Sequence, residues 1–480
     1  MHLLLRYILH LCCITILVIS CTNKETNHLF VSKSNTGIDF ANHLSYTQEI
    51  NPYTYRNFYN GAGVAIGDLN NDGWEDIYFT GNLVDNQLYK NLGNFKFENV
   101  TAYSQTSCPD SWSTGVSLVD INNDNLLDIY VCKSGPPFGE NRANELFINK
   151  GNFRFEEEAS KYGLDVKGFS VHASFFDFDK DGDLDCYLLN NSIRSIGGYD
   201  LRPGLRDEPT MDGNMLLVNT NGRFENRSSE LGIFTSSIGF GLGINTTDLN
   251  DDGWPDIYVA NDFFEKDYFY INHNGEKFEE VGEQYFGSFS MGSMGVDVAD
   301  IDNDGDHDIF VAEMAPESLA RQKTKAVYES WDKYQKGVAS GYYHQFARNM
   351  LHLFDDSHYR DISRSLRLDA TEWSWAPLIF DMNNDGFKDL FISNGIGKDL
   401  LDRDYLAYMA NEQRIGQLLA NRDESSLKKL IDIMPSEKVL NAFFINNDNN
   451  SFERIEESMI RNIKPSFSNA TAIGLSLIHI

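Results

Sequence analysis

A nine-residue pattern, D-x-[DN]-x-D-[GN]-x-x-D, occurs six times along this chain. The first copy is DLNNDGWED at 68–76, and the others begin at residues 120, 177, 248, 300 and 381. Side-chain oxygens at positions 1, 3, 5 and 9, with a backbone carbonyl at position 7, suit a hard cation of the size of Ca²⁺. Glycine at position 6 permits a sharp turn, and Asn125 is the best substitute for it in the second copy. The repeats therefore predict about six calcium-binding turns.

The predicted ligands have a high density of negative charge. Positions 1, 3, 5 and 9 hold twenty carboxylates, four each in the third and fifth copies and three in each of the others. Six Ca²⁺ ions would add +12 and take the net charge from −31 to −19, so we expect metal binding and folding to be coupled and the ions to be structural. The ligand positions are Asp68, Asn70, Asp72, Trp74, Asp76, Asp120, Asn122, Asp124, Leu126, Asp128, Asp177, Asp179, Asp181, Asp183, Asp185, Asp248, Asn250, Asp252, Trp254, Asp256, Asp300, Asp302, Asp304, Asp306, Asp308, Asp381, Asn383, Asp385, Phe387 and Asp389.

An EF-hand loop would also place acidic residues at alternating positions, but it requires a bidentate Glu at position 12. All six copies have an apolar residue there, such as Phe79 or Val131. Short β-branched and aromatic runs follow position 9, and another apolar run precedes each turn, as expected for strands. Each calcium turn is therefore predicted to join the two strands of a hairpin.

A second hairpin follows each of these, with Asn and Gly in its turn, as in LYKNLGNFKFENV at 88–100. Four strands per unit, repeated at intervals of 52 to 81 residues, are typical of β-propeller blades. The sequence thus predicts an all-β propeller with six visible blades. The longer intervals contain insertions at about 191–214, 313–348 and 394–440, the last with helical periodicity near 400–435.

The calcium turns, together with FYNGAGVAIGD at 58–68, GYYHQFARNML at 341–351 and WSWAPLIFDMNNDGFKDLFISNG at 373–395, carry a family resemblance. From about residue 27 onward the chain resembles the VCBS/FG-GAP repeat propellers, in the bacterial branch similar to cartilage acidic protein. The resemblance implies a seven-bladed, Ca²⁺-bearing, usually extracellular propeller without an established activity. Related members often continue into an ASPIC/UnbV module.

The two ends of the chain set the predicted domain limits. SNATAIG at 468–474 matches the first strand of a blade, but no metal turn follows it, which indicates a truncated seventh repeat at 466–480. The alternative is a natural six-bladed protein. We therefore divide the chain into a leader at 1–20, a linker with a possible blade-closing strand at 21–57, the propeller at 58–465 and the seventh-repeat start.

The N-terminus indicates export. Residues 3–19 are apolar but short for a bilayer span, and Val18-Ile19-Ser20-Cys21 resembles a bacterial lipobox, which makes Cys21 the predicted lipidation site. An ordinary cleaved signal and an uncleaved anchor remain alternatives. The predicted location is the cell envelope, at the outer membrane, with contact to the bilayer through lipid only. A net charge of −31 disfavours nucleic acid as a partner.

Three cysteines remain after the leader and Cys21. Cys108 precedes the strand that enters the second calcium turn, and Cys132 ends the strand that leaves it. Antiparallel pairing would bring both to the same end of the hairpin, so we predict a disulfide between them in an oxidising compartment.

The predicted function is that of a calcium-stabilised binding or adhesion module for a glycan or an extracellular protein. All three insertions follow a second strand and would project from the face opposite the metal turns. Trp112, Phe169, Phe240 and Trp373 lie eight residues before a metal turn and either form a ligand-stacking platform or cap the blade core. A polysaccharide lyase or hydrolase is the alternative, with His172, His344 and Arg348 as unconnected candidates. A scaffold within an envelope complex is a third.

Overall fold

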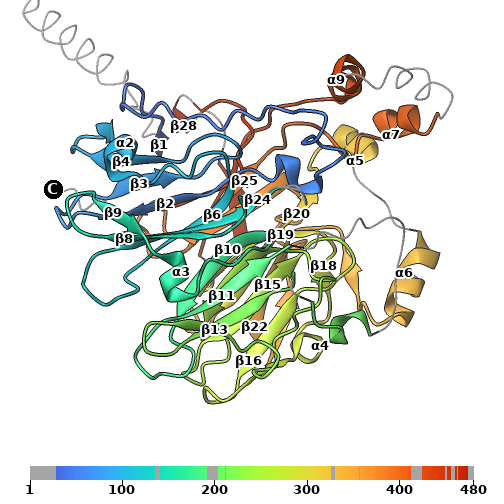
Figure 1. Ribbon diagram of the computed structural model, residues 1–480. Helices are drawn as coiled ribbons and strands as arrows, with labels where there is room; N and C mark the ends of the chain where they lie inside the picture. The colour runs from blue at the N-terminus through green and yellow to red at the C-terminus, as the bar shows by residue number, and fades with distance from the viewer. Residues whose placement is uncertain are drawn as a thin grey trace, which may run out of the picture.

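The computed structural model describes residues 29–135, 141–191, 204–210, 212–325, 330–355, 357–411, 424–448, 451–455, 460–461 and 463–473. Four four-stranded antiparallel sheets follow one another in chain order, and two further four-stranded units are joined into one eight-stranded sheet by pairing of β20 with β24, which confirms the all-β propeller architecture (Figure 1). Their strands are β2 (Val64–Gly67), β3 (Asp76–Phe79), β4 (Gln87–Asn91) and β5 (Phe97–Asn99); β6 (Trp112–Val119), β7 (Asp128–Ser134), β8 (Glu145–Asn149) and β9 (Phe155–Glu157); β10 (Ser170–Phe176), β11 (Asp185–Asn190), β12 (Met215–Asn219) and β13 (Phe224–Asn226); β14 (Gly241–Thr247), β15 (Asp256–Asn261), β16 (Tyr268–Asn272) and β17 (Phe278–Glu280); β19 (Ser293–Ala299), β20 (Asp308–Ala315), β22 (Met350–Asp355) and β23 (His358–Asp361); and β24 (Glu372–Phe380), β25 (Asp389–Asn394), β26 (Ala442–Asn447) and β27 (Ser451–Arg454).

We number these sheets as blades 1 to 6. The first strand of each blade packs beside the first strand of the next, in the order β2, β6, β10, β14, β19, β24. Glycine makes this approach possible: a Cβ on Gly295 would lie 2.1 Å from the Trp375 carbonyl oxygen, and one on Gly63 would lie 2.7 Å from that of Thr114. The first strands therefore meet along the centre of the molecule, where a propeller has its channel.

The hydrophobic core forms layers between neighbouring blades rather than one central cluster. Between blades 2 and 3, for example, Tyr130 and Leu146 pack with Leu188 and Leu217. The second residue after position 9 is a fully buried Tyr in blades 1 to 4, as Tyr78 and Tyr130 illustrate. Alternating apolar residues on strand two supply both layers, since successive side chains point to opposite faces of a sheet.

Short helices and insertions complete the fold. The helices α2 (Thr101–Ser104), α3 (Ala159–Tyr162) and α4 (Gly282–Tyr285) follow fourth strands. The helices α5 (Leu319–Lys325) and α6 (Trp331–Ala339) lie in the insertion after β20, and α7 (Arg403–Met409) and α9 (Glu424–Ile433) lie in the helical insertion predicted after β25. All four stand on the right-hand side of Figure 1. None of the helices in the described ranges is long and apolar enough to cross a membrane.

The N-terminal part of the chain pairs with its C-terminal part. Strand β1 (Phe30–Val31) is parallel to β28 (Ile460–Arg461). Near the end, the backbone N–H of Ser468 donates to the Asn394 carbonyl (3.0 Å), and the Asn469 amide donates to the Tyr59 carbonyl (3.3 Å). The predicted leader, Cys21 and residues 474–480 lie outside the described residues.

The predicted disulfide is wrong. Cys108 and Cys132 are both free thiols, and both are buried. Cys108 packs with Tyr78 in the layer between blades 1 and 2, whereas Cys132 packs with Cys186 in the layer between blades 2 and 3. The two side chains belong to opposite faces of blade 2, so bringing them to the same end of the hairpin does not bring their sulfurs together.

Candidate functional site

The six acidic turns share one backbone geometry. Two residues of each turn have positive φ: position 6, as in Gly73 (85°), and position 4, as in Asn71 (57°) and Lys180 (59°). The side chain at position 1 closes the turn; Asp68 Oδ1 accepts from the Asp72 amide (3.1 Å) and Oδ2 from the Gly73 amide (2.7 Å). Backbone N–H groups therefore hold the carboxylate at position 1 in place without a bound ion.

Position 9 is the buried junction of three strands. Asp76 is fully buried; its Oδ2 accepts from the Leu69 amide (3.0 Å) before the turn, and its Oδ1 from the Asn91 amide (2.8 Å) at the end of strand three. The corresponding two bonds are present in all six copies. The copies are Asp76, Asp128, Asp185, Asp256, Asp308 and Asp389.

Burial makes these carboxylates reluctant to ionise. Desolvation raises the pKa of Asp76, Asp185 and Asp256 to about 7, of Asp128 to about 6 and of Asp308 to about 8. The neighbouring carboxylates of each turn act in the same direction, while the two backbone donors oppose it. A divalent cation beside these groups would reverse the balance and favour the charged form.

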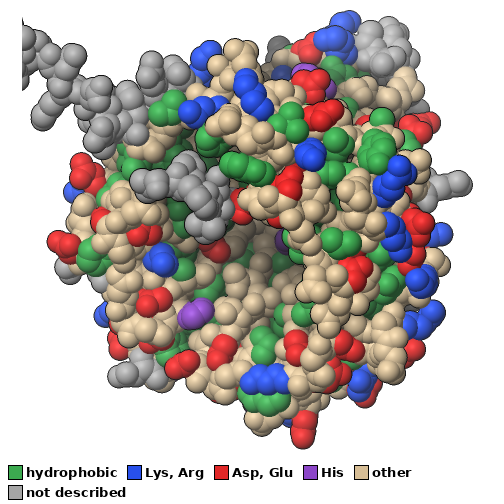
Figure 2. Space-filling view, turned by 90° about the vertical axis from the view of Figure 1, so that its left-hand side faces the viewer, with side chains coloured by type: hydrophobic (Ala, Val, Ile, Leu, Met, Phe, Trp, Pro, Cys, Tyr) green, Lys and Arg blue, Asp and Glu red, His purple; other side chains and the backbone are tan. Residues whose placement is uncertain are grey.

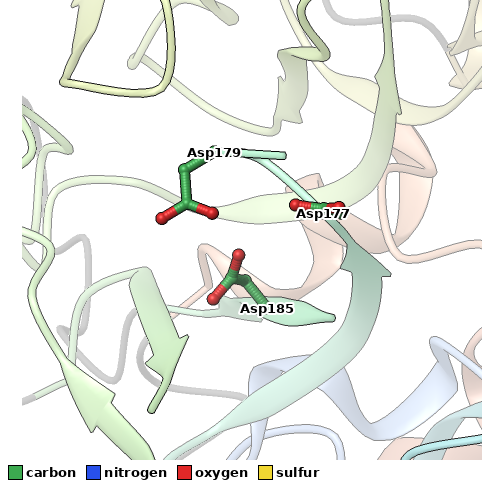
Figure 3. A group of neighbouring side chains, drawn as sticks. All are labelled: Asp177, Asp179 and Asp185. Carbon is green, nitrogen blue, oxygen red and sulfur yellow. The ribbon is translucent and has the colours of Figure 1, made fainter. Parts of the chain in front are cut away.

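The third and fifth turns have the most acidic composition. Carboxylate oxygens of Asp177, Asp179 and Asp185 all lie within 4.8 Å of one another, and so do those of Asp300, Asp302 and Asp304. Figure 3 shows the carboxylates of Asp179 and Asp185 facing each other, with Asp177 beside them. Burial, followed by repulsion from Asp181, raises the pKa of Asp179.

Some oxygens in these two turns lack a hydrogen-bond donor. Among the described residues, the buried Oδ1 atoms of Asp177, Asp183 and Asp306 accept no hydrogen bond. Leaving a buried acceptor unsatisfied costs about 1–3 kcal/mol. Orphaned carboxylate oxygens that converge on one space fit a hard divalent cation, so the residues present are consistent with the predicted calcium ligands.

Asn at position 3 changes the local chemistry of the other turns. The Asn70 amide donates to Asp72 Oδ2 (2.8 Å), and Asn70 Oδ1 accepts from the Asp72 amide (3.1 Å). The fourth and sixth turns repeat this pair of bonds with Asn250 and Asn383. In these turns the Asn amide at position 3 therefore offsets part of the negative charge of the Asp at position 5.

A set of Asn residues that we did not single out from the sequence fixes the turns to the next blade. Asn149, at the end of strand three, donates to the Leu127 carbonyl of its own turn (2.9 Å) and to the Leu69 carbonyl of the preceding blade (2.8 Å). Asn272 and Asn446 repeat these contacts. The recurring Asn after an apolar triplet in the second hairpins of blades 2, 3, 4 and 6 was the available signal.

Position 4 also links neighbouring turns. The Asn71 amide donates to the Asn125 carbonyl (2.9 Å), and the Asn303 amide donates to the Gly386 carbonyl (3.1 Å). Lys180 Nζ lies 4.2 Å from the centre of the Trp254 ring, a cation–π contact between the third and fourth turns. The metal-turn face is therefore cross-linked from blade to blade.

The predicted aromatic platform is covered. Trp112, Phe169 and Phe240 are buried, and Trp373 is half-buried. The chain's own residues cover them: Tyr55 contacts Trp112 edge-on at 5.0 Å, and Phe58 lies 5.5 Å from it. Together with Met294, Trp375 and Ile396, residues Tyr55, Phe58 and Tyr59 form one hydrophobic cluster. In this conformation Trp112, Phe169 and Phe240 pack as core residues, and Trp373 packs partly against the same cluster as Trp112.

The three candidate catalytic residues make separate contacts. His344 Nδ1 bonds the Tyr334 hydroxyl (2.6 Å), and Arg348 donates through Nε (3.1 Å) and Nη2 (2.8 Å) to Asp361. His172 lies on β10, where burial lowers its pKa. The contacts of these residues do not bring them together at a common site.

A cavity of about 470 Å³ lies where the first strands of blades 2 and 3 approach their metal turns. Its walls include Ser117, Asp120, His172 and Ser174. Figure 2 shows that the molecule is hollowed at the centre of the face on the left-hand side of Figure 1. Ser117 and Ser174 already bond neighbouring strands, to the Ala173 carbonyl (2.6 Å) and the Thr246 hydroxyl (2.7 Å).

Comparison with known proteins supports the repeat assignment. The FG-GAP-like repeat family matches residues 68–131 and 248–311, which contain the first, second, fourth and fifth turns. Cartilage acidic protein 1 of Mus musculus is 28% identical over 201 residues, 42% of this chain and 28% of that protein. The protein of the same name from Xenopus tropicalis is 26% identical over 235 residues, 48% of this chain and 32% of its own length. The match thus spans less than a third of these relatives.

Two solved structures show weaker likeness. An Agrocybe aegerita lectin described as recognising non-reducing terminal N-acetylglucosamine aligns at a TM-score of 0.44 and 12% identity, covering 83% of this chain and 81% of its own. The exotype rhamnogalacturonan lyase YesX aligns at 0.35 and 11% identity, covering 71% and 54%. With TM-scores below 0.5, neither structure bears on the function of this chain.

Proposed function

The chain is an FG-GAP repeat β-propeller related to cartilage acidic protein 1, and on that premise we propose that it is a calcium-stabilised binding module of the cell envelope. Its ligand is a glycan or an extracellular protein, bound on the face opposite the metal turns. Lipid on Cys21 holds the module at the outer membrane.

The position of the insertions carries this proposal. The acidic turn joins strands one and two of a blade, so strand two ends at the opposite face. The α5–α6 insertion begins after β20 and the α7–α9 insertion after β25, both at that face. Variable insertions on a rigid scaffold are where binding residues usually lie.

In the proposed function calcium has a structural role, because it stabilises the acidic turns. Side chains at positions 1, 3, 5 and 9 and the position 7 carbonyl would hold the ions. Bound Ca²⁺ supplies positive charge to the clustered carboxylates, which include the orphaned oxygens of Asp177, Asp183 and Asp306. The protein residues then hold each turn in shape, and the blade-to-blade Asn bonds transmit that order to neighbouring blades.

Binding of the purified protein to a glycan array and a panel of extracellular proteins tests the proposal, with millimolar Ca²⁺ and with EGTA. We expect a specific signal in calcium that is lost in EGTA. Absence of any signal in calcium, from protein that melts cooperatively, would refute a binding role.

The anchor has its own test. Cells expressing the wild-type protein and Cys21→Ser are grown with a labelled fatty acid. Label in the wild-type protein alone supports the anchor, whereas equal label in both, or none in either, contradicts it.

A further inference from the structure

An exposed stack of rings projects from the α5–α6 insertion. Trp331, the first residue of α6, is 70% exposed. Its ring stacks on Tyr334 at a centroid distance of 5.3 Å, and Tyr334 in turn stacks on His344 (5.9 Å) and Phe346 (5.8 Å). The interplanar angles in these three pairs are 30°, 26° and 24°, so each of the other three rings is tilted by no more than 30° from the Tyr334 ring. We call these four residues the ring stack.

The rings are held in place by polar contacts. The Tyr334 hydroxyl bonds His344 Nδ1 at 2.6 Å, which joins the helix to the strand region after it. The Arg348 guanidinium lies 4.9 Å from the Phe346 ring centre and is fixed by its two bonds to Asp361. Strand β21 (Gln345–Phe346) pairs with β18 (Phe289–Ser290), which ties the base of the stack to blade 5. A large exposed indole at the end of a pre-organised stack has little conformational entropy left to lose on binding.

None of the residues of α6 is buried, so the helix does not serve the core. Figure 1 shows α6 standing at the right-hand edge, beyond the sheets. The remaining side chains of its first two turns are polar, namely Asp332, Lys333, Gln335 and Lys336. An indole face surrounded by polar groups matches a pyranose ring, which is apolar on its faces and polar around its edge.

The charge around the stack differs from that of the whole chain. Residues 330–348 contain three basic residues, Lys333, Lys336 and Arg348, and one acidic residue, Asp332. Because Arg348 is paired with Asp361, this segment and Asp361 together carry a net charge of +1, in a chain with a net charge of −31. A local positive field within an acidic surface favours ligands with negative charge.

We propose that the ring stack is a binding site for a polysaccharide that carries carboxylate groups, with Trp331 as the principal stacking residue. This inference rests on the proposed binding function and names its ligand class. One sugar ring stacks on the open face of Trp331, and the carboxylates of the polymer lie in the field of Lys333 and Lys336.

The test is titration of the full protein in millimolar Ca²⁺ with hyaluronan oligosaccharides, with neutral dextran as a second probe. The variants are Trp331→Ala and Tyr334→Phe. Tyr103→Ala is the matched control, because Tyr103 is also exposed (52%) and has an arginine, Arg154, over its ring at 4.9 Å, but lies on α2. Melting curves in the same buffer establish that each variant is folded.

We expect Trp331→Ala to weaken hyaluronan binding by about tenfold or more, the equivalent of ~1.4 kcal/mol. Tyr334→Phe keeps the rings but loses the bond to His344, so about a two- to threefold loss is expected. Tyr103→Ala should bind as the wild type does, and dextran should bind more weakly than hyaluronan.

Other outcomes separate the two proposals. If the wild type binds a glycan or protein and Trp331→Ala binds it equally well, the ring-stack site is wrong and the binding function stands. If Trp331→Ala loses a protein ligand but no saccharide, or if dextran binds as tightly as hyaluronan, the ligand class is wrong. If the wild type binds nothing in calcium, the binding function itself fails.

Discussion

The turn at 177–185 and the turn at 68–76 have the same backbone shape but opposite internal chemistry. In the turn at 68–76, the amide of Asn70 donates to Asp72, so a neutral side chain offsets part of the negative charge. In the turn at 177–185, Asp179 occupies that position, and carboxylates converge without an internal donor of this kind. The turn at 300–308 has the same acidic composition. The difference shows that the same turn geometry forms with Asn or Asp at position 3, and we propose that the number of carboxylates sets how strongly a turn depends on a cation.

Removal of calcium is the most severe test of this dependence. We expect EGTA to lower the melting temperature by about 10 °C or more relative to millimolar Ca²⁺, because several sites each contribute ~2.7 kcal/mol at a hundredfold excess over Kd. Differential scanning calorimetry in both buffers measures this effect. Superimposable melting curves would show that neither kind of turn depends on calcium.

The pH dependence of the metal-free protein is the next largest expected effect. Five of the six position 9 carboxylates have folded-state pKa values of about 6 to 8, above the ordinary value of 3.8, and burial also raises the pKa of the sixth, Asp389. The folded state therefore binds their protons more tightly than the unfolded state does, and this stabilisation is lost as pH rises through those values. In EGTA the melting temperature should fall by several degrees between pH 5.5 and 8.5. Ca²⁺ should flatten this trend, because the ion replaces the proton; a rise with pH in EGTA would contradict the prediction.

Exchange of Asn and Asp at position 3 is a smaller and more specific test. Asp179→Asn with Asp302→Asn should raise the free energy of unfolding in EGTA by about 0.5–1.5 kcal/mol per turn, because an amide donor replaces a repelled carboxylate. The calcium-induced gain in stability should shrink at the same time.

The reciprocal pair, Asn70→Asp with Asn250→Asp, is the matched control and should shift both quantities in the opposite direction. Urea titrations of the four proteins with and without Ca²⁺ measure the free energies. Shifts of the same sign in both pairs would mean that position 3 does not distinguish the two kinds of turn.

The sequence was sufficient to locate the turns and hairpins because each of them is specified by residues that lie close together in the chain. Positions 1, 5 and 9 are Asp in every copy, and strand propensity follows each turn within three residues. The helical insertion was also visible from its periodicity, since α7 and α9 lie within the predicted range.

Contacts between distant residues could not be predicted in the same way. Asn149 and Leu69 are 80 residues apart, and nothing in either hairpin alone indicates their bond. The sequence left open whether Trp112 belongs to a platform or to the core for a related reason: its position at the start of β6 was foreseeable, but its burial depends on Tyr55 and Phe58 from another part of the chain. The disulfide prediction placed both cysteines at the same end of the hairpin, but it did not consider which face of the sheet each side chain occupies.

The cluster formed by Tyr55, Phe58 and Tyr59 has a consequence for the order of folding. These residues are synthesised before all the blades, yet besides Trp112 of blade 2 their partners include Met294 and Trp375 on the first strands of blades 5 and 6 and Ile396 just after the second strand of blade 6. The Tyr53 hydroxyl contacts that of Tyr405, which is 352 residues away. Loop closure over such distances costs entropy that no local contact repays, so this early segment must wait until the last blades have formed. We therefore expect the amides of this segment to gain protection from hydrogen exchange last. The N-terminal residues would then join the folded structure at the end of folding, although they are synthesised first.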